Sequence, residues 1–470
     1  MRSTTALTSR TPLWRLTAAQ LAAGFREGAF TPLQALEACL ARSAEVNPRL
    51  NALVALDAEG ATHAAEQSSA RWRAGRALGP LDGVPLTIKD NLHVRGLPTH
   101  WGSRALAGLV AERDELPVAK LREAGAVIFG KTNVPEFTMQ GYTGNPVFGA
   151  TGNPWNPALT PGGSSGGAVA LVAAGGCPIA LATDGGGSIR RPASHTNLVG
   201  LKPSRGRVPR GGGLPPIFLD FEVAGPLARC VDDVAAMMQV IGRGGVQPVP
   251  AVATIPARIL YIPRFGDHPV DPAIAALTDA AARQLAALGH EVTTADRFEM
   301  AQAVNERWPL LSQVGLAWLV AHPQALSSTR PFDPASFGPV MQANAQAGRD
   351  ASALALFDLL FEAERLRTAL ASLFERHDFL LTPAAAALPW PAGETHPPRI
   401  DGREVGPRGH AVFAGFVNAA GLPAIALPCG FAQGLPVGLQ LVAREGGDDA
   451  LLALARAFEG AHPWQRFPEL

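Results

Sequence analysis

The stretch TPGGSSGGAVALVAAGGCPIALATDGGGSIRRPA, residues 160–193, decides the fold. Two loops rich in glycine enclose an apolar run whose small residues predict a tightly packed helix over 166–175 and a buried strand over 178–184. A flexible Gly/Ser linker would join separate domains, whereas the first loop leads directly into the apolar helix. The stretch therefore predicts a helix and a strand at the centre of a core, with a glycine loop next to each.

The second loop, DGGGSIRRP at 184–192, carries the chemistry. Glycines let backbone N–H groups converge without side chains in the way, and convergent N–H groups stabilise an oxyanion in acyl transfer. Ser188 ends the glycine row and is a candidate nucleophile, but serine needs a base. None of the eleven histidines lies in an evident pairing motif. Lys89, at the end of the predicted strand GVPLTIKD (83–90), is the alternative base, because burial favours a neutral lysine.

Strands and helices alternate outward from this stretch. Apolar runs predict strands at 83–90, 126–130, 257–263, 379–383, 424–431 and 438–443, and periodic segments predict helices at 117–125, 271–288, 349–376 and 448–459. Capping signals predict two N-terminal helices, the second ending at Asn47-Pro48, and residues 51–76 look helical. Strands separated by helices predict an α/β fold with helices on both faces of the sheet.

The composition excludes several classes of protein. Lys plus Arg is 40 and Asp plus Glu is 40, so the formal net charge of +0 gives no overall attraction to nucleic acid or to an anionic membrane. A hydrophobic fraction of 47% excludes general disorder. The 4 Cys lie far apart without metal-like spacing and indicate reduced thiols. We expect a cytoplasmic protein with no metal, no nucleic-acid partner and no membrane association.

Five motifs occur in order over residues 83–209: GVPLTIKDN, GKTNVPEF, TPGGSSGG, TDGGGSIRRPA and GLKPSRGRVP. Together they resemble the amidase signature family, serine hydrolases with a Ser-cisSer-Lys triad, and a weaker resemblance extends from about residue 30 to 465. The resemblance implies one domain over residues 1–470, with N-terminal helices at about 15–76. Its expected fold is an α/β/α sandwich around a mixed, mostly parallel sheet.

The resemblance also implies a catalytic triad. Ser188 matches the nucleophile, and Ser164 matches the bridging serine, whose peptide bond to Gly163 is cis in the family. Lys89 matches the base, which would take a proton from Ser188 through Ser164. The expected reaction is cleavage of an amide C–N bond through an acyl-enzyme, without a cofactor.

Further residues carry over with lesser roles. The backbone N–H groups of Ser188 and of the three preceding glycines, Gly185, Gly186 and Gly187, would hold the oxyanion. Thr138 matches a position whose backbone faces the substrate. Supporting roles in orienting the loops fall to Ser165, Asp184 and Arg190.

Several segments depart from the family pattern and leave the substrate open. The run Pro98-Thr99-His100-Trp101-Gly102-Ser103 replaces paired threonines, and His195-Thr196-Asn197 replaces an aromatic-Cys-Gly stretch, so the roles of His100 and His195 stay undecided. An apolar segment, GGGLPPIFLDF at 211–221, and four aromatic residues of the variable region favour a roomy apolar pocket. The four are Trp308, Trp318, Phe332 and Phe337. Aryl or alkyl amides are the expected substrates; anilides, esters and carbamates (urethanes) share the carbonyl chemistry.

A competing motif, GAVIFGKT at 125–132, satisfies the Walker A pattern for nucleotide binding. A phosphate loop follows a strand and opens a helix. Here the helix comes first, the middle residues are strand formers, and Asn133-Val134-Pro135 is a poor helix start. We therefore interpret Lys131 as a structural or surface lysine.

Two functional hypotheses remain. The first is an amide hydrolase that acts on a small molecule as a monomer or homodimer. The second is the amidase subunit of a glutamine-dependent tRNA amidotransferase, which needs a glutamine pocket and a partner subunit. Hydrolysis of amides by the purified chain, without preference for glutamine, would distinguish the two.

Overall fold

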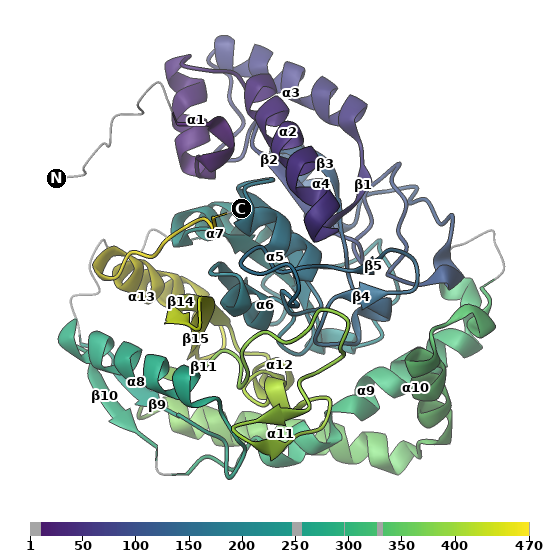
Figure 1. The fold of residues 1–470 in the computed structure, drawn as a ribbon, viewed down its shortest axis with the longest axis vertical. Coiled ribbons are helices and arrows are strands. Elements are labelled where there is room, and N and C mark those ends of the chain that lie inside the picture. The colour runs from purple at the N-terminus through teal and green to yellow at the C-terminus, as the bar shows by residue number, and fades with distance from the viewer. Residues whose placement is uncertain (1–10, 247–255, 296, 327–331, 470) are drawn as a thin grey trace.

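A mixed sheet of eleven strands runs through the computed structural model of the chain, which describes residues 11–246, 256–295, 297–326 and 332–469 (Figure 1). In spatial order the strands are β1 (Leu53–Leu56), β3 (Val127–Thr132), β2 (Pro85–Lys89), β6 (Ile179–Asp184), β8 (Val223–Ala228), β7 (Val199–Lys202), β14 (Ala424–Ala432), β15 (Leu435–Ala443), β11 (Phe379–Pro383), β9 (Arg258–Tyr261) and β10 (Glu291–Thr294). Two small hairpins, β4 (Gly144–Asn145) with β5 (Gly149–Ala150) and β12 (Arg399–Ile400) with β13 (Arg403–Glu404), lie outside it.

The sheet is mixed, as expected, but it is not mostly parallel. Parallel ladders join β2 to β3 and β6, and β9 to β10 and β11, whereas the other six neighbouring pairs are antiparallel. One reason is that β8 lies between β6 and β7 and runs opposite to both. Another is the tight turn at Gln433-Gly434, which joins β14 to β15 as a hairpin.

Helices cover both faces of the sheet. Strand β6 shows this directly: Ile179 and Leu181 pack into one buried cluster, and Ala180 and Ala182 into another on the opposite face. The first cluster takes α1 (Ala18–Glu27), α4 (Leu116–Glu123), α7 (Val231–Ile241), α8 (Pro272–Ala287) and α13 (Asp448–Ala461). The second takes α2 (Pro32–Leu50), α3 (Ala58–Arg73), α5 (Gly166–Ala173) and α6 (Arg190–His195). The arrangement is the expected α/β/α sandwich in a single α/β domain.

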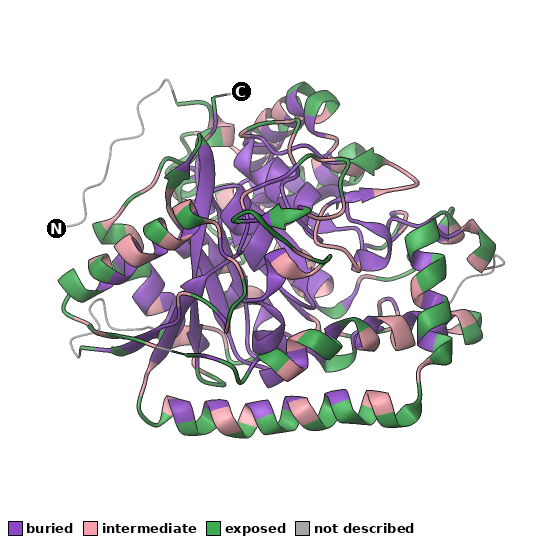
Figure 2. Ribbon diagram, turned by 60° about the horizontal axis from the view of Figure 1, so that its bottom comes forward, coloured by how far each residue is buried: buried purple, intermediate pink, exposed green. Residues whose placement is uncertain are grey.

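A third group of helices extends the domain toward the bottom of Figure 1. It consists of α9 (Gln302–Ala321), α10 (Pro339–Asp350), α11 (Ala353–Phe374) and α12 (Gly415–Ala420), which share a buried apolar cluster. Figure 2 shows that the central strands are almost wholly buried, whereas the peripheral helices keep exposed faces. This group matters for function because α9 and the segment before α12 line the cavity described below.

The N-terminal predictions need two corrections. The second helix does not end at Asn47-Pro48, because Pro48 is accommodated in the last turn of α2, which continues to Leu50. Residues 51–76 are not wholly helical, because Leu53–Leu56 forms β1 before α3 begins. The Asn47 side chain accepts hydrogen bonds from the backbone N–H groups of Ala52 and Leu53, each at 2.8 Å, and so turns the chain toward the sheet.

A third correction concerns the predicted helix at 349–376. Ser352 separates α10 from α11 because its hydroxyl accepts a hydrogen bond from the backbone N–H of Ala355 at 3.1 Å and begins a new helix. The other strands and helices named from the sequence are present within one to three residues at most boundaries. Residues 1–10 and 470 of the predicted domain lie outside the described residues.

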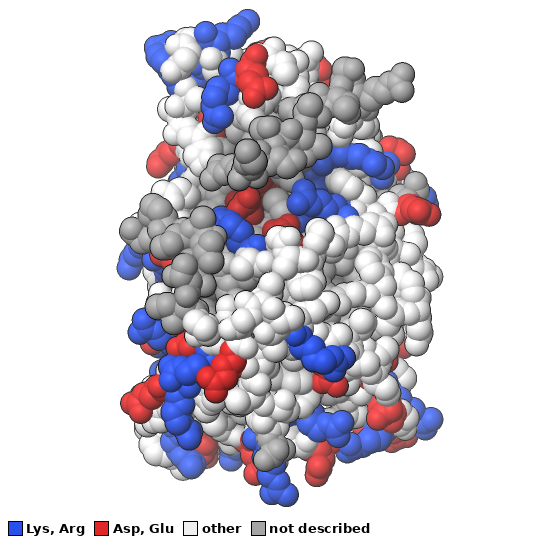
Figure 3. Space-filling view, turned by 90° about the vertical axis from the view of Figure 1, so that its left-hand side faces the viewer, with Lys and Arg blue, Asp and Glu red and all other residues white. Residues whose placement is uncertain are grey.

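The surface of the molecule carries charges of both signs (Figure 3). On the face in Figure 3, basic and acidic side chains lie together in the upper and lower parts, and a broad uncharged area lies between these two charged regions. In the described part of the chain, no helix has the length and apolar character needed to cross a membrane. Nor do the described residues bring three or more His, Cys, Asp or Glu side chains into a metal-holding group.

Candidate active site

A cavity of about 390 Å³ lies where β6 meets the second glycine loop. Its lining comes from segments far apart in the sequence: residues 138–141, the second glycine loop with Arg191, the chain just before β8, helices α9 and α10, and the chain before α12. Ser188 is 7% exposed and lines this cavity, whereas Lys89 and Ser164 are almost fully buried outside its lining. The three predicted triad residues therefore differ in their access to a ligand.

Lys89 ends strand β2 and is fully buried. Its Nζ lies 2.8 Å from Ser164 Oγ, and it donates to the carbonyl oxygen of Thr183 at 3.1 Å and to Thr183 Oγ1 at 3.0 Å. Burial lowers the pKa of Lys89 to about 7, and the negative charges of Glu222 and Asp184 partly oppose that shift. A substantial share of Lys89 side chains is therefore neutral near pH 7.

The first glycine loop brings Ser164 to this lysine. The peptide bond between Gly163 and Ser164 is cis, as the resemblance implied. A side chain at Gly163 would place its Cβ 2.3 Å from the carbonyl oxygen of Tyr142, so only glycine fits there. The backbone N–H of Ser165 donates to the carbonyl oxygen of Ser188 at 3.3 Å, and this bond joins the two glycine loops.

The three glycines before Ser188 do not face the same way. Gly185 and Gly186 line the cavity together with Ser188. The N–H of Gly187 instead donates to Asp184 Oδ1 at 2.7 Å, and Gly187 is not part of the cavity lining. This geometry does not support the expected oxyanion role of Gly187, because the Asp184 carboxylate already binds its only backbone donor.

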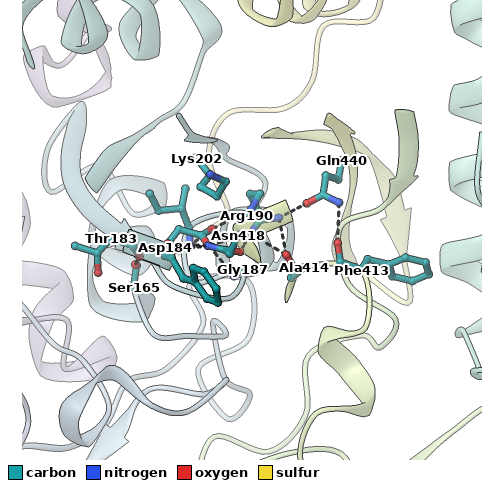
Figure 4. Close-up of polar contacts among 12 residues, drawn as sticks. Ser165, Thr183, Asp184, Gly187, Arg190, Lys202, Phe413, Ala414, Asn418 and Gln440 are labelled. Atoms are coloured by element: carbon teal, nitrogen blue, oxygen red, sulfur yellow. Dashed lines mark hydrogen bonds and ion pairs between the residues drawn. The ribbon is translucent and has the colours of Figure 1, made fainter. Parts of the chain in front are cut away.

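Asp184 organises the loop that carries Ser188, as Figure 4 shows. Its carboxylate accepts hydrogen bonds from the N–H groups of Gly187 and Ile189, the latter at 3.1 Å, and forms a buried ion pair with Arg190 at 2.9 Å. Asn418 of α12 donates to the carbonyl oxygen and to Oδ1 of Asp184 at 2.9 and 3.0 Å. Burial alone would raise the pKa of Asp184, but the charge and hydrogen bonds of Arg190 hold that pKa well below its ordinary value.

Arg190 extends this network into the C-terminal strands. Its guanidinium donates to Gln440 Oε1 of β15 and to Asn418 Oδ1, each at 2.6 Å. Gln440 in turn donates to the carbonyl oxygen of Phe413 at 2.9 Å (Figure 4). The positions predicted to support the loop, Ser165, Asp184 and Arg190, are thus all in contact with the segments that form it.

Thr138 lines the cavity, as its predicted substrate-facing position requires. It follows Phe137 in a turn where both residues have positive φ angles, 52° and 58°. The indole Nε1 of Trp101 donates to Thr138 Oγ1 at 3.1 Å, which holds the threonine against the unusual segment at 98–103.

Two histidines and one lysine left open by the sequence have structural contacts. His100 packs edge-on against Phe148, and its backbone N–H donates to Asp90 at 3.1 Å. His195 is 2% exposed, and its Nε2 lies 3.1 Å from the carbonyl oxygen of Ala387. Lys131 is a buried strand residue paired with Asp90 at 2.9 Å, so the Walker-like segment at 127–132 is strand β3 and not a phosphate loop.

The expected apolar pocket is only partly present. Phe218 and Trp308 line the cavity, but Gly211–Gly213 and Leu214 line a separate surface hollow. Trp318 is 46% exposed and Phe337 packs on Phe137, so neither shapes the lining. Sequence reasoning missed the charged members of the lining, which are Arg191, Glu222 and Arg408. Of these three residues, only Arg191 lies in a recognisable sequence motif, as the second arginine of GSIRRP at 187–192.

Comparison with known proteins agrees with this geometry. Residues 34–452 match the profile of the Amidase family. The chain is a member of the amidase signature family. A relative from Symbiobacterium thermophilum is 33% identical over 494 aligned residues. The alignment covers 94% of this chain and 96% of the relative. A second relative, from Myxococcus xanthus, is 34% identical, and the alignment covers 96% of this chain and 98% of that relative. Both relatives are named as subunits of a glutamyl-tRNA(Gln) amidotransferase.

Solved structures show the same fold. A bacterial aryl acylamidase superposes with a TM-score of 0.87 at 28% identity, covering 97% of this amidase and 98% of that chain. A 6-aminohexanoate cyclic dimer hydrolase, in complex with its substrate, also has a TM-score of 0.87, at 30% identity, with 98% and 99% covered. The family and these neighbours show an amide-hydrolysing enzyme.

The buried pair of Asp184 and Arg190 supplies a stability test for this amidase. Arg190→Met should lower the free energy of unfolding by about 3–5 kcal/mol, because it leaves the Asp184 carboxylate buried without its cation. Urea unfolding at neutral pH measures the loss. The matched control is Arg456→Met, whose ion pair with Asp232 is largely exposed and should contribute little. Equal losses in the two variants would contradict the importance of the buried pair.

Proposed function

We propose that the chain hydrolyses a small-molecule amide through a covalent acyl-enzyme, with Ser188 as nucleophile, Ser164 as proton bridge and Lys89 as base. The observation that carries the proposal is the buried amine of Lys89, 2.8 Å from Ser164 Oγ, beside the loop that presents Ser188 to the cavity. No cofactor is part of the proposed reaction.

The contacts of Lys89 suit a neutral amine. A neutral amine has two N–H donors and one lone pair. In the neutral form we assign the two N–H groups to the carbonyl oxygen and Oγ1 of Thr183. The lone pair then takes the third contact of Nζ, at 2.8 Å from Ser164 Oγ, where an ammonium would donate instead. Lys89 can then take the Ser164 proton while Ser164 takes the proton of Ser188.

Attack by Ser188 Oγ on the amide carbonyl carbon forms a C–O bond and moves the carbonyl electron pair to oxygen. The backbone N–H groups of Gly185, Gly186 and Ser188 are the donors we assign to that oxyanion, since these residues line the cavity. The C–N bond then breaks, and the proton returns from Lys89 through Ser164 to the leaving amine. Water then attacks the carbonyl carbon of the ester and gives a proton through Ser164 to Lys89. The C–O bond to Ser188 breaks, and that proton returns to Ser188 Oγ as the acid is released.

The cavity volume of about 390 Å³ suits a small molecule. Trp308 and Phe218 supply apolar surface for an aryl or alkyl group. Carbamates and esters present the same carbonyl to Ser188, so a urethane-cleaving activity belongs to the proposal as a related substrate class.

The second candidate function is that of an amidotransferase subunit. The observation that favours it is the name of the curated relatives, 33% and 34% identical over nearly their whole length. In that role the chain would release ammonia from glutamine and act with a partner subunit. The Ser188 chemistry would be the same, and the substrate and the partner would differ.

The two candidates predict different activities for the purified chain. As an independent hydrolase, the chain alone should cleave aryl or alkyl amides with kcat/KM at least about tenfold above that for glutamine. Release of the amine and of ammonia measures the two reactions side by side. Glutamine turnover above that of every other amide tested would instead favour the amidotransferase role.

Removal of a triad side chain should abolish turnover in a folded protein. We expect Ser188→Ala and Lys89→Met each to lower kcat by at least about a thousandfold, because nucleophile and base act as a unit. Thermal unfolding shows whether each variant is folded. Lys120→Met is the control with unchanged rates, because among the described residues the Lys120 amine donates to the carbonyl oxygen of Ile241, outside the cavity. Near-normal rates in folded Lys89→Met would rule out Lys89 as the base.

The pH dependence follows from the pKa of Lys89, lowered to about 7. A base must be unprotonated, so kcat/KM for an uncharged amide should rise with pH up to about 7 and then level off. Glu222 raises this pKa by its charge, so Glu222→Gln should move the midpoint to lower pH. A profile that falls with rising pH, or a midpoint that moves upward in Glu222→Gln, would contradict this assignment.

A further inference from the structure

Arg191 places a buried cation next to the nucleophile loop. It is 3% exposed and lines the cavity. Its Nε would lie 2.7 Å from a Cβ built on Gly187, so the guanidinium lies directly against the loop of Ser188. Its Nη1 lies 2.6 Å from Nε2 of His410, and its buried Nε has no hydrogen-bond partner among the described residues.

His410 does not neutralise this cation. Burial lowers the pKa of His410 well below its ordinary value, and the charges of Arg191 and Arg408 lower it further. The imidazole is therefore neutral and accepts the hydrogen bond from Arg191. Asp184 attracts the Arg191 cation at longer range, but its carboxylate is in direct contact with Arg190 and two backbone N–H groups instead.

Arg408 brings a second guanidinium to the same cavity. It lies 5.7 Å from the ring centroid of Trp308, and the indole Nε1 of Trp308 would lie 2.9 Å from a Cβ built on Gly186. A single side chain thus separates Arg408 from the loop. Its buried Nη2 has no hydrogen-bond partner among the described residues.

Neither guanidinium has an acidic partner within ion-pair distance in the described part of the chain, although Arg408 also borders a second hollow whose lining includes four acidic residues, Asp267, Glu299, Glu306 and Glu404. Glu222 is the acid of the catalytic cavity. It flanks Gly185, at the other end of the loop from Arg191, and binds Arg210 and Asn91. Positive charge therefore remains uncompensated at the end of the cavity near Gly187.

Desolvated cations without counter-ions are costly, and a ligand of opposite charge removes that cost. A guanidinium fork matches the geometry of a carboxylate and binds it through two parallel N–H donors. The unpaired Nε of Arg191 and Nη2 of Arg408 are donors of this kind, and both belong to side chains that line the cavity of Ser188.

We propose that Arg191 and Arg408 bind a carboxylate of the substrate, so that the preferred substrates of this site are amides bearing a negative charge. The proposal rests on the hydrolase function proposed above and narrows its substrate class. It replaces the wholly apolar pocket expected from the sequence with one that combines the Trp308 ring and a charged end.

The test compares two matched pairs of ligands. Glutaric acid monoanilide against valeranilide places the carboxylate on the acyl side, and para-acetamidobenzoate against para-acetamidobenzamide places it on the amine side. Binding is measured by calorimetry with the folded Ser188→Ala variant, which cannot turn the ligands over, and kcat/KM is measured with the unaltered chain. We expect at least about tenfold tighter binding of the charged member in one pair, and the same preference in kcat/KM.

Variants assign the preference to the two arginines. Arg408→Met and Arg191→Met, each combined with Ser188→Ala, should bring the binding ratio close to one, and Arg408→Lys should retain part of it. Arg365→Met, at an exposed arginine of α11 paired with Glu362, is the matched control and should leave the ratio unchanged. If Arg191→Met fails to fold, Arg408→Met and the ratio in the Ser188→Ala background decide the outcome.

Three outcomes are distinguishable. Neutral ligands that bind as tightly as the charged ones in both pairs would overturn the proposal. A charge preference that survives in folded Arg408→Met and Arg191→Met would overturn the assignment to these residues. Absence of turnover for every ligand with the unaltered chain would reject the hydrolase function, while a charge preference in binding would still support carboxylate recognition.

Discussion

The carboxylate of Asp184 is the point on which the site depends. It holds the turn of the second glycine loop through the N–H groups of Gly187 and Ile189, and it is neutralised by Arg190. Because Arg190 and Asn418 also contact the C-terminal strands and α12, one buried charge ties the nucleophile loop to segments more than 200 residues away in the sequence. The position of Ser188 is thus a property of the whole domain.

The sheet supplies the second constraint. Parallel pairing of β2 with β6 places Lys89 beside Thr183, whose two oxygen atoms hold the amine. The preceding helix α5 begins at the first glycine loop, which brings Ser164 to the same amine. Strand pairing therefore determines the contacts of Lys89, and burial between strands and helices depresses its pKa. The packing that stabilises the sheet therefore also sets the protonation of Lys89.

Local motifs carried much of this information. The segments at 160–193 and 83–90 predicted the central helix, two strands and the lysine between them, since glycine spacing and apolar runs act over short distances. The same reasoning missed β7 and β8 and overestimated the parallel pairing, because strand order is a long-range property. It also assigned Gly187 to the oxyanion, although only the folded turn shows that Asp184 binds its N–H.

The sequence by itself determined the family and the α/β class, and it singled out Lys89, Ser164 and Ser188 as the proposed triad, because their motifs are short and ordered. The tertiary structure decided which groups surround Ser188. Arg408 and Trp308 reach the cavity from segments with no motif, and Arg191 becomes informative only once the described residues show no acidic side chain in direct contact with it. The physical reason is that charge compensation depends on distances between side chains, and these distances arise only when remote segments pack together.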